Sequence, residues 1–151
     1  MANLVKSFLS KQDLNDVAEA IKDAEHRTAG EIRVAIRHKR SRKEKGHSVE
    51  QLARHEFVHL GMTKTKERTG ILIFILLESK EFFILADEHI NQEVAPRSWD
   101  SIAGAMAARF AKREFRLGLL DGVRSVGDHL AEHFPAKPGD KNELSNEVDV
   151  S

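Results

Sequence analysis

The stretch from Thr69 to Ile90 constrains the fold of this chain more than any other segment. It holds two apolar runs, Ile71–Leu77 and Phe82–Ala86, which are separated by the polar residues Glu78–Glu81. The β-branched and aromatic content of both runs favours strands, and the short polar break between them predicts a hairpin. In the first run apolar side chains occupy both alternating faces, so neither face can be left in water. We therefore expect a sheet covered by helices on both faces.

The segments before the hairpin predict a βαβ unit. A capping box at Ser10–Asp13 opens a helix that stops near Gly30, and alternation then predicts a strand over Glu31–Arg37. This strand should have one solvated face and lie nearer an edge of the sheet. A second capping box at Ser48–Gln51 opens a helix that ends near Gly61. A strand, a helix and the central strand in this order predict parallel pairing, so the fold class is α/β with a central mixed sheet.

Helices and a tail are predicted after the hairpin. A short helix should run to Val94, Ser98 can cap the next helix, and a last helix should follow Gly118. From residue 135 onward the chain has little apolar surface to bury. We therefore predict an α/β domain over residues 1–134 and a flexible or loosely docked tail over residues 135–151.

Composition excludes several kinds of chemistry. The chain has 151 residues, 24 basic and 24 acidic, so its net charge does not recruit nucleic acid, and we expect no sequence-specific nucleic-acid binding. It has no cysteine, which excludes thiolate catalysis, cysteine-bound zinc and disulfides. Neither a signal-peptide pattern nor an apolar run of membrane-spanning length occurs in the sequence. We expect a cytoplasmic monomer with an unidentified protein partner.

A loop dense in basic residues follows the first strand. Such a run can contact phosphates or anionic lipid headgroups, but it lacks the interleaved aromatic residues that stack on bases. Its basic residues surround a single acidic residue, Glu44, and are Arg37, Lys39, Arg40, Arg42, Lys43 and Lys45. We interpret it as a solvated loop, with weak contact to anionic membranes as the functional alternative.

The sequence His55-Glu-Phe-Val-His59 is a literal H-E-x-x-H pattern on a predicted helix. Two imidazoles one helical turn apart can share a zinc ion while Glu56 deprotonates a bound water, as in zinc peptidases. The extended metzincin pattern fails, because Gly61 follows His59 by two residues instead of three and no third histidine comes at the required interval. Histidines on an ordinary helix surface are the interpretation that we favour. His129 and His133 repeat the spacing near the last helix end, where we expect solvated side chains.

Acidic residues at the end of the hairpin give the preferred candidate site. Asp87, Glu88 and Asp100 could supply the oxygen ligands that Ca²⁺ or Mg²⁺ requires. The structural alternative is helix capping and favourable charge at helix N-termini. The sequence contains no glycine-rich phosphate loop and no G-x-S-x-G elbow, and we identify no catalytic residue and no cofactor-binding residue.

Several motifs together resemble the TPM domain family over nearly the whole chain. They are Thr28-Ala-Gly-Glu-Ile-Arg-Val34, Phe57-x-x-Leu60-Gly-Met-x-x-Thr65-x-x-Arg68-x-Gly70-Ile-Leu-Ile-Phe, Ala86-Asp-x-x-Ile90 and Trp99-Asp100. The C-terminal His133-Phe-Pro135 and Asp140-Lys-Asn-Glu-Leu144 are similar to its short branch, which lacks the signal sequence and membrane helix of its relatives. The resemblance implies an α/β sandwich. For the wider family it implies divalent-cation binding and, in some members, acid phosphatase activity.

Two departures from the family pattern fall where a metal or phosphate site would lie. Arg68-Thr69-Gly70 stands where the family often has Asp-Asn-Gly, and Ala86-Asp87-Glu88 stands where it often has Gly-x-Gly. We therefore predict a binding or accessory module with a weak divalent-cation site at the hairpin end. The alternative is a metal-assisted phosphomonoesterase at the same place.

Overall fold

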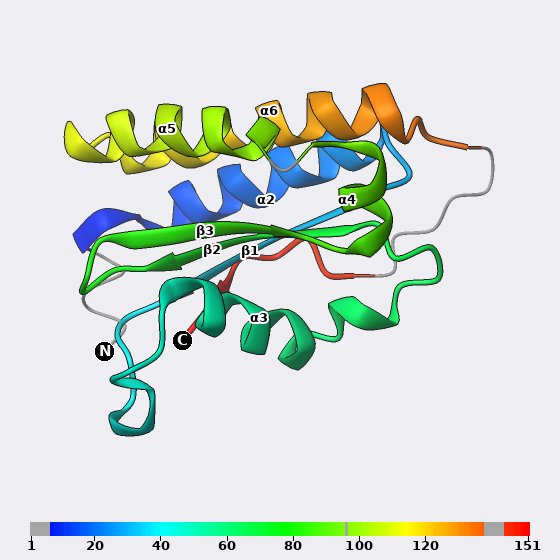
Figure 1. The fold of residues 1–151 in the computed structure, drawn as a ribbon. Coiled ribbons are helices and arrows are strands. Elements are labelled where there is room, and N and C mark those ends of the chain that lie inside the picture. The colour runs from blue at the N-terminus through cyan, green and yellow to red at the C-terminus, as the bar shows by residue number, and fades with distance from the viewer. Residues whose placement is uncertain (1–6, 96, 138–143) are drawn as a thin grey trace.

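The computed structural model describes residues 7–95, 97–137 and 144–151, which form a mixed four-stranded sheet between two helical layers (Figure 1). The strands are β1 (Glu31–Arg37), β2 (Gly70–Leu76), β3 (Glu81–Ala86) and β4 (Asp149–Val150), in the order β3-β2-β1-β4. β1 pairs in parallel with β2 and with β4, and β2 pairs antiparallel with β3. The predicted βαβ unit, hairpin and α/β fold class are confirmed.

The helices divide between the two faces of the sheet. Helices α2 (Lys11–Glu25), α5 (Arg97–Ala111) and α6 (Phe115–His133) lie on one face, and α3 (Val49–His59) lies on the other (Figure 1). The described residues also include the short helix α4 (Glu88–Glu93) after the hairpin, and the 3₁₀ turns η1 (Arg42–Glu44) and η2 (Met62–Lys64) on either side of α3. Helices therefore cover both faces, as predicted.

Alternation along β2 separates two hydrophobic cores. Ile71, Ile73 and Ile75 face the core beneath α2, α5 and α6, whereas Leu72, Phe74 and Leu76 face the smaller core beneath α3. Every residue of β2 is buried. Side chains of a strand alternate between faces, so one apolar run supplies both cores and fixes the three-layer arrangement.

Capping residues set two helix starts where the sequence predicts them. The side chains of Ser10 and Ser48 each accept a hydrogen bond from the backbone N–H three residues later. The side chains of Asp13 and Gln51 in turn accept the backbone N–H of Ser10 and Ser48. The other two starts differ from the prediction. Ser98 lies inside α5, and α6 begins before Gly118, because that glycine is a packing position in the helix and not a stop.

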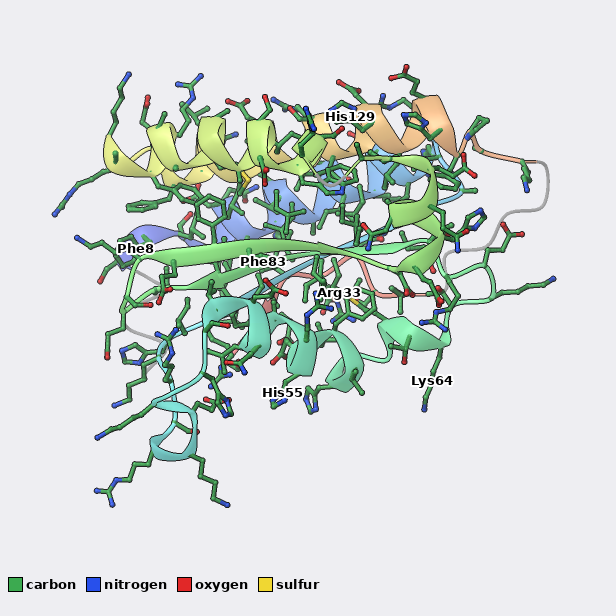
Figure 2. All side chains as sticks on the ribbon, viewed as in Figure 1. Phe8, Arg33, His55, Lys64, Phe83 and His129 are labelled. Atoms are coloured by element: carbon green, nitrogen blue, oxygen red, sulfur yellow. The ribbon has the colours of Figure 1, made fainter. Side chains whose placement is uncertain are left out.

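The prediction of a solvated face on β1 is wrong. Ala35 belongs to the core beneath α3, Glu31 is buried, and Arg33 is half-buried between the sheet and α3 (Figure 2). A polar residue of this strand can be buried because it has a hydrogen-bond partner. The carboxylate of Glu31 accepts the backbone N–H of Leu144 at 2.9 Å. β1 is an inner strand of the sheet.

The end of the tail is part of the sheet, which the sequence did not reveal. The backbone N–H of Ser151 donates to Ile36 at 2.9 Å, and that of His38 donates to Ser151 at 3.0 Å. These bonds place β4 on the open edge of β1, where unpaired backbone groups would otherwise face solvent. Residues 138–143 of the tail, including most of the Asp140–Leu144 motif, lie outside the described residues.

Three glycines let α6 approach its neighbours closely. A Cβ at Gly118 would lie 2.6 Å from the ring of Phe110, and one at Gly122 would lie 2.6 Å from the sulfur of Met106. A Cβ at Gly127 would lie 2.7 Å from the Cβ of Ala24 on α2, an atom that cannot move without its backbone. The contact between α2 and α6 therefore requires glycine at this position.

Alanine substitutions at two helical glycines should have opposite effects on stability. Gly127→Ala should lower the free energy of unfolding by roughly 1–3 kcal/mol, because the added methyl overpacks the α2–α6 contact. Gly104→Ala is the matched control, since nothing lies within 4 Å of its added methyl. It should raise the free energy of unfolding by about 0.5–1 kcal/mol through helix propensity. Urea denaturation followed by circular dichroism measures both, and equal stability of the two variants would contradict the packing argument.

Candidate functional site

Asp87 is the residue about which the hairpin-end site is built. Its backbone N–H continues the sheet by donating to Gly70 at 2.8 Å, and its side chain then caps α4 by accepting from the N–H of Glu88 at 2.7 Å. The carboxylate is buried, with only 5% of the side chain exposed. An ionised carboxylate in this position requires a charge partner.

Arg68 supplies that charge. Its guanidinium donates from Nε to Oδ2 of Asp87 at 2.9 Å and from Nη2 to Oδ1 at 3.1 Å, and Nη2 also lies 3.4 Å from Oε2 of Glu88. These interactions, above all the hydrogen bonds to Asp87, raise the pKa of Arg68. Both oxygens of Asp87 are therefore held by the same planar cation, which is the strongest geometry for an arginine–carboxylate pair.

The backbone around Arg68 holds this arrangement in place. Arg68 has φ of 57°, in the left-handed region that non-glycine residues seldom adopt. Its carbonyl accepts the N–H of His89 at 3.3 Å, and the ring of His89 contacts the carbonyl of Glu67 through Nδ1 at 3.0 Å. The loop before β2 and the start of α4 are thus joined by backbone as well as by charge.

The structure brings together two of the three residues predicted to bind a cation. Asp87 and Glu88 are adjacent and share Arg68, whereas Asp100 is an exposed residue in the first turn of α5. Among the residues that the structure describes, no group of three or more His, Asp and Glu side chains could hold a metal ion. The cation site stays a prediction, and a cation at Asp87 would have to displace Arg68.

This cluster lies at the amino ends of the two inner strands. β3 runs antiparallel to β2, so the end of β3 is adjacent to Gly70, where β2 begins. Ligands of open α/β sheets gather at the carboxyl ends of parallel strands, which here are Arg37 and Leu76 at the opposite end of the sheet. The strand-end rule therefore does not support a site at Asp87.

A pair of buried carboxyl groups at the same end of the sheet went unrecognised in the sequence. Glu25, the last residue of α2, accepts the N–H of Ile32 at 2.8 Å, and Glu31 is 4% exposed. Burial raises the pKa of Glu25 to about 8, with a further contribution from the neighbouring charge of Glu31. A glutamate in the last turn of a helix is common in surface helices, so the sequence contains no signal that Glu25 is buried.

The H-E-x-x-H helix lies on the far side of the sheet. His55 and His59 are exposed on α3, and Figure 2 shows His55 on the side that points away from the sheet. The His47 and His55 rings meet edge to face with centroids 5.8 Å apart. Burial raises the pKa of Glu56, and the charge of Asp149 on β4 adds to it. An open depression of about 610 Å³ is lined by Arg37, His55, Glu56, His59 and Asp149. Zinc binding there stays a prediction.

Internal ion pairs neutralise part of the basic loop. Arg37 binds Glu44 at 2.7 Å, which lowers the pKa of Glu44 to about 2, and Arg40 binds Glu81 at 3.0 Å. The remaining cations of the loop are exposed, and they are Lys39, Arg42, Lys43 and Lys45. Contact with anionic membranes stays a prediction, with four of the six basic residues available for it.

His129 and His133 lie near the end of α6. The ring of His129 packs edge to face against Trp99 with centroids 5.7 Å apart, and His133 is exposed in the last helical turn. His129 is therefore a packing contact between α5 and α6.

A family model for the TPM domain matches residues 5–129, so this chain belongs to the TPM domain family. The chain is similar to the BA42 protein of the psychrophilic bacterium Bizionia argentinensis, with 35% identity, a TM-score of 0.86, and coverage of 95% of this chain and 96% of that one. The N-terminal domain of a protein from P. gingivalis shares the fold at 18% identity, with a TM-score of 0.65 and coverage of 86% and 83%. No curated protein matches significantly. In the described part of the chain, no helix has the length and apolar character needed to cross a membrane.

Glu25 should make the stability of this protein fall as pH rises. Its pKa is near 4.5 when unfolded and about 8 when folded, so between these values the folded state binds more protons than the unfolded state. The free energy of unfolding should therefore decrease between about pH 4.5 and 8, by an amount on the order of 4 kcal/mol, and level off above. Glu25→Gln keeps an acceptor for Ile32 without the charge, and should remove this component.

Urea titrations at several pH values between 5 and 8.5 measure the effect. Glu19→Gln, an exposed position on the same helix, is the control and should follow the wild-type curve. Parallel pH profiles for wild type and Glu25→Gln would show that Glu25 ionises in the folded state as it does in the unfolded state.

Proposed function

We propose that this TPM domain is a binding module whose ligand site is the cluster of Arg68, Asp87 and Glu88, and that the cluster takes Ca²⁺ or Mg²⁺ weakly. The observation that carries the proposal is the buried carboxylate of Asp87, which is paired with an arginine whose side chain is 43% exposed. Glu88, exposed beside it, offers a second carboxylate. Hard divalent cations bind carboxylate oxygens.

Weak affinity follows from competition between two cations. The guanidinium of Arg68 must leave both oxygens of Asp87 before a metal ion can reach them, so the measured affinity reflects an exchange of partners. The exposed arginine can turn into solvent while the loop keeps its backbone bonds to His89. Asp100 is the third ligand that the sequence predicts, and it lies on α5, whereas Glu88 lies on α4.

Metal-assisted hydrolysis of phosphate monoesters is the enzymatic alternative at the same place. It requires an ion that polarises a phosphoryl oxygen and activates a water molecule. Arg68 occupies the carboxylate that would hold the ion, and hydrolysis needs that ion to stay bound while it activates water, so weak binding is the function that we favour. Cation titrations and phosphate-ester turnover, measured on the wild type and on Asp87→Asn, distinguish the two functions.

Removal of Arg68 should strengthen cation binding. Arg68→Asn suits the left-handed backbone, because Asn adopts positive φ more readily, and it adds an oxygen ligand. Its affinity for Ca²⁺ should exceed that of the wild type by roughly ten- to hundredfold, the range of a hydrogen bond to a charged group. Asp87→Asn should abolish binding. Backbone-amide NMR titrations with Ca²⁺ and Mg²⁺ measure affinity and position, with saturable shifts expected around Asp87–Ile90.

Two controls accompany these titrations. Asp100→Asn shows whether the third residue is a ligand, since unchanged affinity would restrict the site to Asp87 and Glu88. Turnover of an activated phosphate ester that Asp87→Asn abolishes would establish the hydrolytic alternative. No amide shifts in either wild type or Arg68→Asn with both ions would refute a cation site at the hairpin end.

A further inference from the structure

A second cavity lies at the opposite end of the sheet from Asp87. Its volume is about 370 Å³, and it lies between the segment before α2, the turn that joins β2 to β3, and the turn that joins α5 to α6. Ile36 and Ile75, near the carboxyl ends of β1 and β2, form its floor. This is the end of an open α/β sheet at which ligands are bound.

Four phenylalanine rings form a continuous wall of this cavity. The rings of Phe8 and Phe115 meet edge to face at 4.4 Å, Phe115 lies 5.7 Å from Phe110, and Phe110 lies 5.4 Å from Phe82. All four line the cavity and are only partly buried, although they pack against the main core. Figure 2 shows Phe8 at the same end of the molecule as the β2–β3 turn. Half of the chain's 8 phenylalanines thus leave apolar surface open to one cavity.

Two cations stand at the mouth of the cavity. Lys80 projects from the β2–β3 turn and Arg113 from the α5–α6 turn, and both are exposed and line the cavity. Within the described ranges neither forms an ion pair with a carboxylate. Glu81, the acidic residue of the lining, is bound to Arg40 at 3.0 Å. The rim therefore carries uncompensated positive charge above an apolar interior.

We infer that this cavity binds a medium-chain carboxylate, with its acyl chain against the four rings and its carboxylate between Lys80 and Arg113. Small-molecule sites are concave and mostly apolar, with a few polar groups that orient the ligand, and about 370 Å³ lies at the small end of their usual range of about 300–1,000 Å³. The charge at the rim selects an anion over a neutral apolar molecule. This site is separate from the cation site proposed above, and neither depends on the other.

A chain-length series tests the inference on the full chain. Butanoate, hexanoate and octanoate are titrated separately into labelled protein, and backbone-amide shifts are recorded. Affinity should increase roughly fourfold for each added methylene, as expected from burial of apolar surface. Octanol, which has the chain without the charge, should bind more weakly than octanoate. Shifts should cluster at residues 8–9, 80–82 and 110–115.

Matched variants separate this site from adventitious binding. Lys80→Asn and Arg113→Asn, both compatible with the positive φ of 55° and 62°, should each weaken octanoate binding roughly two- to fivefold. Ala107→Leu narrows the cavity and should abolish binding, whereas Ala108→Leu, exposed on α5 outside the lining, should bind as the wild type does. Lys43→Asn on the basic loop is the charge control and should have no effect.

Three results would overturn the inference. The first is octanoate shifts that do not saturate or that lie outside the cavity. The second is equal affinity of Ala107→Leu and Ala108→Leu. The third is a change in the chemical shifts of these same amides when only the protein concentration is varied. That result would identify a second copy of the chain as the occupant of the cavity.

Discussion

Strand β2 has a paired strand along each edge and a hydrophobic layer against each face, and the other elements are arranged to complete that burial. Backbone groups of β2 bond to β1 and β3, while its side chains alternate between the core under α2, α5 and α6 and the core under α3. A strand buried in this way cannot be left with an uncovered face, because each exposed apolar side chain would forfeit roughly 1.5–3 kcal/mol of burial. The helices on both faces follow from this requirement.

The two ends of the sheet differ in the charged groups that line their candidate sites. At the amino ends of β1 and β2, Asp87, Glu31 and Glu25 bring carboxyl groups into buried positions, and Arg68 is the arginine that pairs with Asp87. At the carboxyl ends, Lys80 and Arg113 border an apolar cavity. The two proposals therefore concern ligands of opposite charge.

Arg68 decides the charge of the hairpin end in this chain. An acidic residue at this position would add to the negative charge at Asp87, whereas the arginine cancels it. Arg68 has a positive φ, which costs backbone strain at a non-glycine residue, so the surrounding contacts must hold the loop in this conformation. The side chain of Arg68 thus places Asp87 in an internal ion pair.

The sequence determined the local structure and the layers, because these depend on short-range patterns. The alternation of Ile71 to Leu77 predicted a strand buried on both faces, and the capping boxes at Ser10 and Ser48 predicted two helix starts. The order of strand, helix and strand predicted parallel pairing of β1 with β2. The same patterns placed Asp87 and Glu88 next to each other at the end of the hairpin.

Only the tertiary structure decided which distant residues meet. Arg68 and Asp87 are separated by a hairpin, Ser151 bonds to Ile36 from the far end of the chain, and Phe8 meets Phe115 across the helical layer. Strand β4 was missed because two residues are too short to show a period, and its position depends on the open edge of β1. Asp100 was grouped with Asp87 as a candidate oxygen ligand, whereas in the structure it is an exposed residue of α5. Such contacts are set by the packing of whole elements, which no local pattern records.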